Sequence, residues 1–271
     1  MRTLLILGAG SAGTMTANML RPQLARDEWT ITVVAQDDIH DYQPGYLFLP
    51  FGMYKPTEIR RSSHSFLPEG VNFVVAEVDR VDVETDTVHL GGAKSGEALT
   101  YDYLVIATGT TPRPDQTPGM PEGLATLSVQ EFYTFEGAQR CARALESFTG
   151  GRLVVHVAET PIKCPVAPLE FVLLAEDYLR ERGLRDRTEI IYATPLPGAF
   201  TRPVASKLLG DLLSSRGIAV EADFAVESID APARTIAAYD GRELPYDLLV
   251  TVPVNMGADF VARSGLGDEL N

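Results

Sequence analysis

The 271-residue sequence predicts an α/β protein made of two similar units, each a parallel β-sheet covered by helices and interrupted by a β-meander. Three observations predict this fold. The chain opens with an apolar strand, a glycine turn and a helix. Strand-like apolar runs then alternate with helical patterns, and the segment 96–105 recurs at 241–250 with Gly, Leu, Tyr, Asp, Leu and Val in register. Such alternation is typical of βαβ units with parallel strands.

The first strand, Leu4–Leu7, leads into a G-x-G-x-x-G motif formed by Gly8, Gly10 and Gly13. In this motif the first glycine permits a tight turn, the second lets the backbone approach a pyrophosphate, and the third lets the helix lie close to the strand. The helix expected over residues 11–24 directs its N-terminal amides toward the phosphates. Strand, turn and helix in this order predict a Rossmann-like nucleotide site.

The second strand, Trp29–Val34, ends where the motif expects an acidic side chain for the ribose hydroxyls. Ala35 and Gln36 occupy that position, and Asp37 and Asp38 follow directly. The sequence therefore leaves open which residue replaces the ribose-binding acid.

The segment that closes the first unit indicates which dinucleotide binds. Residues 71–78 and 87–90 are expected as meander strands, and residues 100–109 as a strand that returns to the sheet and ends in Ala107-Thr108-Gly109. This closing strand resembles the ATG strand of flavoproteins with two dinucleotide-binding domains, the family of glutathione reductase and its relatives. The resemblance implies FAD as cofactor, with the Thr-Gly end against the flavin nucleotide and the backbone near Val78 against the adenine.

The second unit repeats the opening strand but not the glycines. Leu153–Val155 corresponds to the first strand, and in this alignment Val157, Glu159 and Ile162 stand at the three glycine positions. Their side chains block the turn and the close approach of a pyrophosphate, and Glu159 adds like charge. The fold class is therefore two Rossmann-like units, the second without a dinucleotide fingerprint and without a place for NAD(P)H, so electrons must arrive another way.

Cys164 lies just beyond these positions, beside Lys163 and ahead of a helix expected over residues 169–182. A thiol at a helix N-terminus next to an ammonium group has its thiolate favoured by both charges. The competing interpretation is a small buried side chain, since free cysteines are usually buried; the flanking prolines and the missing glycines favour the reactive one. Cys141, beside the apolar face of a helix expected over residues 129–147, is interpreted as structural.

Two strings give a narrower resemblance, which spans the whole chain. Residues 161–168, Pro-Ile-Lys-Cys-Pro-Val-Ala-Pro, resemble the catalytic-cysteine loop of sulfide:quinone oxidoreductases and of the flavoprotein subunit of flavocytochrome c sulfide dehydrogenases. Residues 40–52 resemble the segment beside the flavin ring in that group, with Pro44 closest to the isoalloxazine. Cys164 and Lys163 are then the expected catalytic residues. The expected FAD-binding residues are Gly8, Gly10, Ser11, Ala12, Gly13, Ala35, Gln36, Pro44, Val78, Ala107, Thr108 and Gly109.

The resemblance implies that sulfide or hydrosulfide attacks a cysteine disulfide or a sulfur-bridged form of it. Two electrons pass to FAD while sulfur stays on the protein as a persulfide, a quinone then reoxidises the flavin, and persulfide growth releases polysulfide or sulfur. In that group a further Gly-Asp flavin motif, a second redox cysteine and a membrane-facing region follow the part that matches this chain. We therefore expect either a piece of a longer protein or a reduced homologue.

Composition disfavours several other classes. A formal charge of −14 argues against nucleic acid or an anionic bilayer as a partner. Two cysteines cannot form a disulfide framework, and the four histidines show no metal-ligand spacing, so no metal is expected. No signal peptide and no run of roughly 20 apolar residues is visible. The expected location is the cytoplasm or, peripherally, the inner face of the membrane through regions outside this chain; a homo-oligomer stays open.

Proline-rich crossings predict the domain boundaries: a FAD-binding domain of residues 1–112 plus 251–271, and a second domain of residues 113–250 that carries the redox cysteine. Two other functions stay open. A type II NADH:quinone dehydrogenase shares the fold but needs a second glycine motif. A non-catalytic flavin-binding or sulfur-carrier protein would fit the missing partner cysteine.

Overall fold

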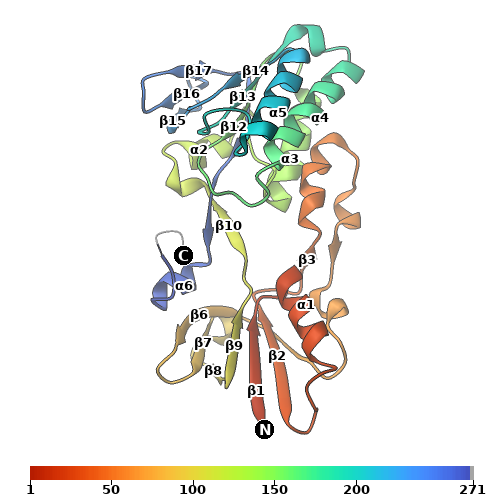
Figure 1. The fold of residues 1–271 in the computed structure, drawn as a ribbon, viewed down its shortest axis with the longest axis vertical. Helices are drawn as coiled ribbons and strands as arrows, with labels where there is room; N and C mark the ends of the chain where they lie inside the picture. Colours follow the sequence, from red (N-terminus) through yellow and green to blue (C-terminus); the bar gives the residue numbers. More distant parts are fainter. Residues whose placement is uncertain (269–271) are drawn as a thin grey trace. The chain divides into compact units, whose positions relative to one another are not determined.

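The computed structural model describes residues 1–268, and the chain divides into two compact units (Figure 1). Of the described residues, the first unit comprises 1–42, 60–111 and 256–268, and the second comprises 43–59 and 112–255. Residues 43–59, which the sequence analysis placed in the first domain, group with the second unit because their apolar side chains are part of its core.

A four-stranded parallel sheet forms the centre of the first unit, in the order β5-β2-β1-β9. Its strands are β1 (Arg2–Leu7), β2 (Trp29–Ala35), β5 (Asn72–Val75) and β9 (Tyr103–Ile106). Leu4 and Ile6 pack in one apolar layer with helix α1 (Ser11–Leu20), while Leu5 and Leu7 pack in the layer on the other side. Both faces of β1 are therefore buried, which explains its continuous apolar run.

An antiparallel meander and a short helix complete the first unit. The meander consists of β6 (Glu77–Asp82), β7 (Thr87–Gly91) and β8 (Ala98–Thr100). Helix α6 (Asp259–Arg263) lies against β6, and the Ser264 hydroxyl that follows it accepts a 2.8 Å hydrogen bond from the Val81 amide. The short strands β3 (His40–Asp41) and β4 (Arg60–Arg61) pair with each other.

The second unit is built on a five-stranded parallel sheet in the order β11-β18-β12-β13-β14. Its strands are β11 (Val129–Gln130), β12 (Gly151–Val157), β13 (Thr188–Ala193), β14 (Ile218–Glu221) and β18 (Leu248–Val252). The helices are α2 (Met120–Leu124), α3 (Phe135–Ser147), α4 (Ala167–Glu181) and α5 (Pro203–Ser215). A second meander consists of β15 (Val226–Asp230), β16 (Thr235–Ala238) and β17 (Glu243–Pro245).

Helices α3 and α4 share one apolar layer of the second unit with alternate residues of β12, and α2 and the meander share the other. The strands β10 (Thr110–Arg113) and β19 (Val254–Gly257) pair along the two segments where the chain passes from one unit to the other. The α/β fold predicted from the sequence is confirmed.

The repeated segment makes the same contacts in both units. In the first, the Asp102 carboxylate accepts a 2.6 Å hydrogen bond from the Thr3 amide, and the Asp102 amide donates a 3.0 Å bond to the Thr3 carbonyl. In the second, Asp247 makes the corresponding pair with Arg152 at 2.7 and 2.9 Å. The aspartate thus fixes the register of the closing strand against the first strand of each sheet, a physical reason for the repeat.

Three predicted helices differ in extent. The helix expected over residues 129–147 begins only at Phe135, because Val129–Gln130 joins the sheet as β11 and Thr134 caps α3 by accepting a 3.0 Å hydrogen bond from the Gly137 amide. Helix α4 begins at Ala167, two residues earlier than expected, and α1 ends at Leu20 rather than near residue 24.

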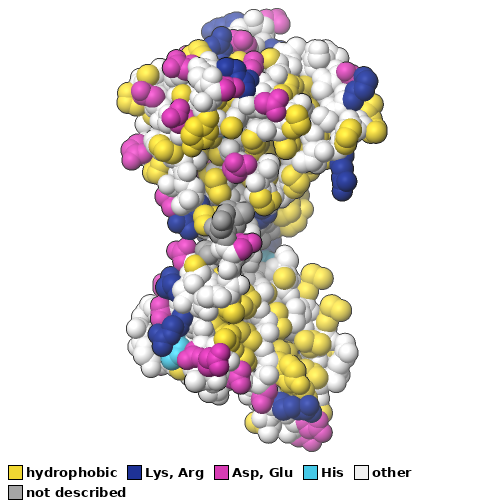
Figure 2. Space-filling model, turned by 60° about the vertical axis from the view of Figure 1, so that its left-hand side comes forward, with side chains coloured by type: hydrophobic (Ala, Val, Ile, Leu, Met, Phe, Trp, Pro, Cys, Tyr) yellow, Lys and Arg dark blue, Asp and Glu magenta, His cyan; other side chains and the backbone are white. Residues whose placement is uncertain are grey.

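No helix within residues 1–268 combines the length and the apolar content that a membrane span requires. Within the same residues, no three or more His, Cys, Asp and Glu side chains gather as a metal site would need. Figure 2 shows acidic and basic side chains interspersed on the visible face of both units, so the net charge of −14 is not gathered in a single patch there.

Candidate functional site

The turn between β1 and α1 is too crowded for side chains at two of its three glycines. Gly8 has a φ of +104°, and its amide donates a 2.7 Å hydrogen bond to the Val34 carbonyl. A Cβ atom at Gly8 would lie 2.3 Å from the Ala107 carbonyl oxygen, and one at Gly13 would lie 1.9 Å from the Gly8 carbonyl oxygen. Both positions therefore require glycine unless the backbone moves.

Gly10 differs from the other two, because a Cβ atom there would meet no atom of the protein within 4 Å. Gly10 is the N-cap of α1, whose first turn begins with the exposed residues Ser11 and Ala12 and carries no acidic side chain. The first amides of a helix lack intrahelical partners, and the helix dipole adds partial positive charge. The open space in front of Gly10 therefore suits a diphosphate.

The end of the closing strand lies against this turn. The Ala107 amide donates a 2.7 Å hydrogen bond to the Leu7 carbonyl, and the Ala107 carbonyl faces Gly8. Thr108 follows, and Gly109 has a φ of +65° with open space where a Cβ would stand. The tertiary structure thus brings the Ala107-Thr108-Gly109 end of the closing strand against the glycine turn at residues 8–13.

At the carboxyl end of β2 the nearby acids are already engaged. The Asp38 carboxylate accepts hydrogen bonds from the loop at residues 62–64, and the bond from the His64 amide, 2.9 Å long, is the main reason why its pKa is lowered. The Asp37 carboxylate accepts a 2.9 Å bond from the amide two residues further on. Ala35 and the exposed Gln36 therefore remain at the position of the ribose acid.

Val78 lies in β6, where its carbonyl accepts a 3.4 Å hydrogen bond from Arg263. Its side chain packs against the meander core. The candidate FAD residues of the first unit therefore lie in three regions. These are the glycine turn, the end of the closing strand, and the region that contains the carboxyl end of β2 and the start of β6. An unblocked helix N-terminus beside a turn that only glycine can form fits a dinucleotide with a diphosphate.

The second unit has a long loop where the first has its short turn. In the first unit residues 8–10 connect strand to helix, whereas in the second residues 158–166 connect β12 to α4. Val157 and Ile162 are buried in the core of the unit, and Glu159 is exposed. Apolar side chains at the start of this loop and within it therefore pack into the core of the unit. In a nucleotide-binding turn, free backbone amides would occupy this place.

Cys164 is exposed in this loop, and it has a φ of +53°. That conformation is unusual for a residue with a Cβ. Its carbonyl accepts a 3.1 Å hydrogen bond from the Tyr133 hydroxyl and another of 3.1 Å from the Ala167 amide, which hold the loop in place. The helix that follows was expected from residue 169 and begins at Ala167, so Cys164 lies three residues ahead of the first turn of α4 rather than within it.

Lys163 lies within this loop, and the negative charge of the buried Glu131 affects its pKa. Burial lowers the pKa of Lys163, and the negative charge of Glu131 opposes that shift. Burial raises the pKa of Glu131, whose carboxylate accepts hydrogen bonds from the amides of Tyr133 and Thr134 and from the Thr134 hydroxyl. Lys163 is therefore a half-buried cation whose charge responds to a second buried group.

Cys141 has the opposite environment to Cys164. It lies within the buried face of α3, not beside it, and it has no solvent exposure. Burial raises the pKa of its thiol, which disfavours the reactive thiolate. Neither cysteine forms a disulfide; Cys164 is exposed and Cys141 is buried.

Pro44 is exposed in a short 3-10 helix, residues 43–47, and belongs to the second unit. The neighbouring Tyr46, Leu47 and Leu49 are buried in the core of that unit. The string at residues 40–52 thus has apolar side chains that pack inward while Pro44 stays accessible.

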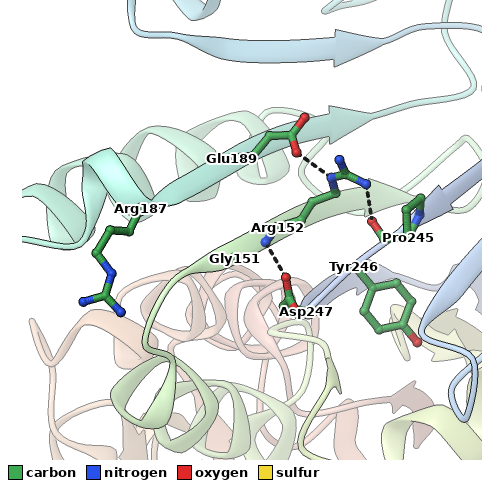
Figure 3. Close-up of a pocket in the computed structure, with 7 residues that line it drawn as sticks. All are labelled: Gly151, Arg152, Arg187, Glu189, Pro245, Tyr246 and Asp247. Carbon is green, nitrogen blue, oxygen red and sulfur yellow. Dashed lines mark hydrogen bonds and ion pairs between the residues drawn. The ribbon is translucent and has the colours of Figure 1, made fainter.

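A separate open depression of about 370 Å³ lies at the amino ends of β12 and β13 and near the start of β18 (Figure 3). The Arg152 guanidinium donates a 2.6 Å hydrogen bond to Glu189, and the Arg152 amide donates to Asp247. Ligands of open α/β sheets bind at the carboxyl ends of the strands. This depression lies at the opposite end of the strands, so it is not the candidate site.

Sequence reasoning missed Glu131, Tyr133 and His40. Tyr133 and Glu131 precede α3 in a stretch that was expected to be helical, and His40 was one of four scattered histidines. Tyr133 and His40 make hydrogen bonds to residues about thirty positions away, Cys164 and Ala9, and the effect of Glu131 on Lys163 also spans about thirty residues. Periodicity carries no signal for contacts of this kind.

Residues 2–253 match the family described as pyridine nucleotide-disulphide oxidoreductase. The chain belongs to this family, whose members are FAD-binding flavoproteins, and the FAD cofactor predicted from the sequence is confirmed.

Individual relatives narrow the comparison. The chain is 25% identical over 276 residues to the mitochondrial sulfide:quinone oxidoreductase of Mus musculus, covering 97% of this chain and 59% of that protein. It is 26% identical over 269 residues to the sulfide-quinone reductase of Aquifex aeolicus, covering 96% and 60% respectively. The crystal structure of the sulfide:quinone oxidoreductase from Aquifex aeolicus superimposes with a TM-score of 0.83 at 25% identity, covering 99% of this chain and 62% of that one. The chain thus spans about three fifths of the length of these relatives.

Proposed function

We propose that the protein oxidises sulfide, or a related reduced sulfur species, through a persulfide on Cys164 and passes the electrons by way of FAD to a quinone. The observation that carries this proposal is the exposed thiol of Cys164, in the loop that stands where a nicotinamide nucleotide would need a glycine turn. Relatives named as sulfide:quinone oxidoreductases, matched along nearly the whole chain, support it.

The chemistry assigned to Cys164 is the formation of one sulfur–sulfur bond. Its thiolate and a hydrosulfide ion join as a cysteine persulfide, which releases one proton and two electrons. FAD, when bound, would supply the acceptor for the two electrons, and a quinone would take them up from it. Tyr133 holds the cysteine backbone through the hydrogen bond to its carbonyl, so that the sulfur keeps a fixed position in an exposed loop.

Lys163 attracts the substrate in this proposal. Its positive charge, next to Cys164 in sequence, draws the hydrosulfide anion toward the thiol. Burial lowers the pKa of Lys163, and the negative charge of Glu131 opposes that shift and so favours the ammonium form. Cys164 and Lys163 are thus the proposed catalytic residues, with Glu131 acting through Lys163.

FAD is assigned to the glycine turn and the closing strand of the first unit. Gly8, Gly10 and Gly13 with Ser11 and Ala12 would hold the diphosphate, Ala35 and Gln36 the ribose, and Ala107, Thr108 and Gly109 the flavin nucleotide. Val78 is proposed beside the adenine and Pro44 near the ring. Because the second unit offers no glycine turn, NADH is not the proposed electron donor.

A quinone acceptor places the protein near a membrane, so we further propose a peripheral attachment on its inner face, with the bulk of the protein in the cytoplasm. The supporting observations are the quinone in the names of the relatives and the lack of a spanning helix within residues 1–268.

The test is anaerobic bleaching of the FAD absorbance by sulfide. The wild type and the control variant Cys141→Ala should both bleach, because Cys141 is buried and unreactive, whereas Cys164→Ser should not. NADH should leave the flavin oxidised in all three. Equal bleaching of Cys164→Ser and wild type would refute the assignment. FAD binding without sulfide-dependent bleaching in any form would favour the flavin-binding or sulfur-carrier alternative.

A further inference from the structure

We propose that His40 is a positioning residue for the FAD diphosphate: its imidazole fixes the peptide between Ala9 and Gly10 so that the Gly10 amide faces the phosphates. The juxtaposition behind this inference is the 2.9 Å contact between His40 Nδ1 and the Ala9 carbonyl oxygen, in the middle of the glycine turn. The inference concerns cofactor binding and does not depend on the proposed sulfide chemistry.

The direction of this hydrogen bond follows from its partners. A carbonyl oxygen can only accept, so His40 Nδ1 must carry the hydrogen and donate. Ala9 is 6% exposed, and its carbonyl is therefore a group that needs a partner within the protein. His40 reaches it from β3, about thirty residues further along the chain.

The consequence for the diphosphate comes from peptide geometry. The carbonyl of Ala9 and the amide of Gly10 belong to one planar trans peptide unit, in which C=O and N–H point in opposite directions. A carbonyl held toward His40 therefore turns the Gly10 N–H away from His40. A Cβ at Gly10 would meet no protein atom within 4 Å, so there is room for a phosphate beside the residue that carries this amide.

His40 is itself held from several sides. Its ring lies 4.5 Å from the ring of Phe66, centroid to centroid. The Phe66 carbonyl in turn accepts a 2.7 Å hydrogen bond from Asn18 on α1. Next to His40, Asp41 accepts two 2.8 Å hydrogen bonds from the guanidinium of Arg60 on β4, and the Asp41 side chain is only 12% exposed. The segment around β3 thus carries the imidazole as a fixed group against the turn.

Three substitutions separate the hydrogen bond from the ring. His40→Phe keeps a ring against Phe66 but removes the donor. His40→Asn retains an N–H donor close to the place of Nδ1, whereas His40→Gln carries its donor one bond further out. Each variant, as the full 271-residue chain freed of FAD, is titrated with FAD, with ADP as a diphosphate without flavin, and with adenosine as a ligand without phosphate. The melting temperature of each FAD-free variant is recorded.

In His40→Phe and His40→Gln the dissociation constants for FAD and ADP should be 3- to 10-fold higher than in wild type, because about one net hydrogen bond is lost. In His40→Asn they should be within about twofold of wild type. Adenosine should bind equally to all forms. Equal weakening of His40→Asn and His40→Phe, unchanged FAD affinity in His40→Phe, or a loss of adenosine affinity as large as that for ADP would overturn the inference. A melting temperature that falls equally in all three variants would instead assign His40 to fold stability and would likewise overturn it.

Discussion

Two single-methyl substitutions in the glycine turn should separate cofactor binding from folding. In Gly13→Ala the new Cβ would lie 1.9 Å from the Gly8 carbonyl oxygen, so α1 or the turn must move by about an ångström. Because the obstacle is backbone, we expect a cost near 3 kcal/mol, the upper end for overpacking, and a melting temperature lower by about 6–12 °C. In Gly10→Ala the Cβ meets no protein atom within 4 Å.

Gly10→Ala should therefore leave stability within about 1 kcal/mol of wild type, since the weaker N-cap and the reduced freedom of the unfolded chain act in opposite directions. The methyl group would instead occupy the space of the diphosphate and separate it from the Gly10 amide. Loss of about two hydrogen bonds to a charged group predicts FAD binding weaker by at least about 100-fold.

The assay compares thermal unfolding of the FAD-free proteins with FAD titration by flavin fluorescence. Gly10→Ala should be folded and unable to bind, whereas Gly13→Ala should be impaired in both measurements. Wild-type FAD affinity in Gly10→Ala would refute the placement of the diphosphate in front of that residue. Wild-type stability in Gly13→Ala would show that the close approach of helix and strand is not required.

Three further predictions concern the second unit. An aromatic disulfide reagent should modify one thiol per native chain, Cys164, and reach Cys141 only after unfolding; two rapidly reacting thiols would contradict the burial of Cys141. Glu176→Gln should cost about 1–2 kcal/mol in urea unfolding, because the buried carboxylate would no longer pair with Arg180, Arg185 and Arg216, whose side chains are 20–59% exposed and keep part of their hydration; a loss below about 0.5 kcal/mol would contradict this. Burial lowers the pKa of His156 to about 3, so between the unfolded value of about 6.5 and that pH the unfolded chain binds the extra proton and stability falls as pH falls. From pH 7 to pH 5 this amounts to about 2 kcal/mol, which His156→Gln should not show; an equal pH dependence in both proteins would disprove it.

The sequence indicated the site best where function requires a residue type at a fixed place in the chain. The three glycines, the Thr-Gly end of the closing strand and the repeat of Asp102 at Asp247 are of this kind. The structure shows a close approach at Gly8 and Gly13 and the paired hydrogen bonds of Asp102 and Asp247, whereas Gly10 and Gly109 have open space where a Cβ would stand. The prediction was wrong before α3, because the expected helix began at Val129 whereas α3 begins at Phe135. Residues that pair with β18 were included in that helix, because a short apolar stretch suits either element.

The surroundings of the candidate residues depend on partners that are distant along the chain. Asp38 could have been the ribose acid by position, but the loop at residues 62–64 engages its carboxylate. The sequence distinguished Cys164, in a proline-rich loop beside Lys163, from Cys141 in a helix, and the structure adds that the first is exposed and the second buried.

By itself the sequence determined the α/β repeat, the nucleotide turn of the first unit, its loss in the second, and the cysteine that stands near the lost turn. These are local: a glycine or a thiol at one position restricts its own backbone or chemistry whatever surrounds it. Only the tertiary structure decided that Gly10 faces open space, that the His40 imidazole meets the Ala9 carbonyl, and that Glu131 is buried beside Lys163. Burial and hydrogen-bond partners depend on which distant segments fold against one another, and no short stretch of sequence contains that information.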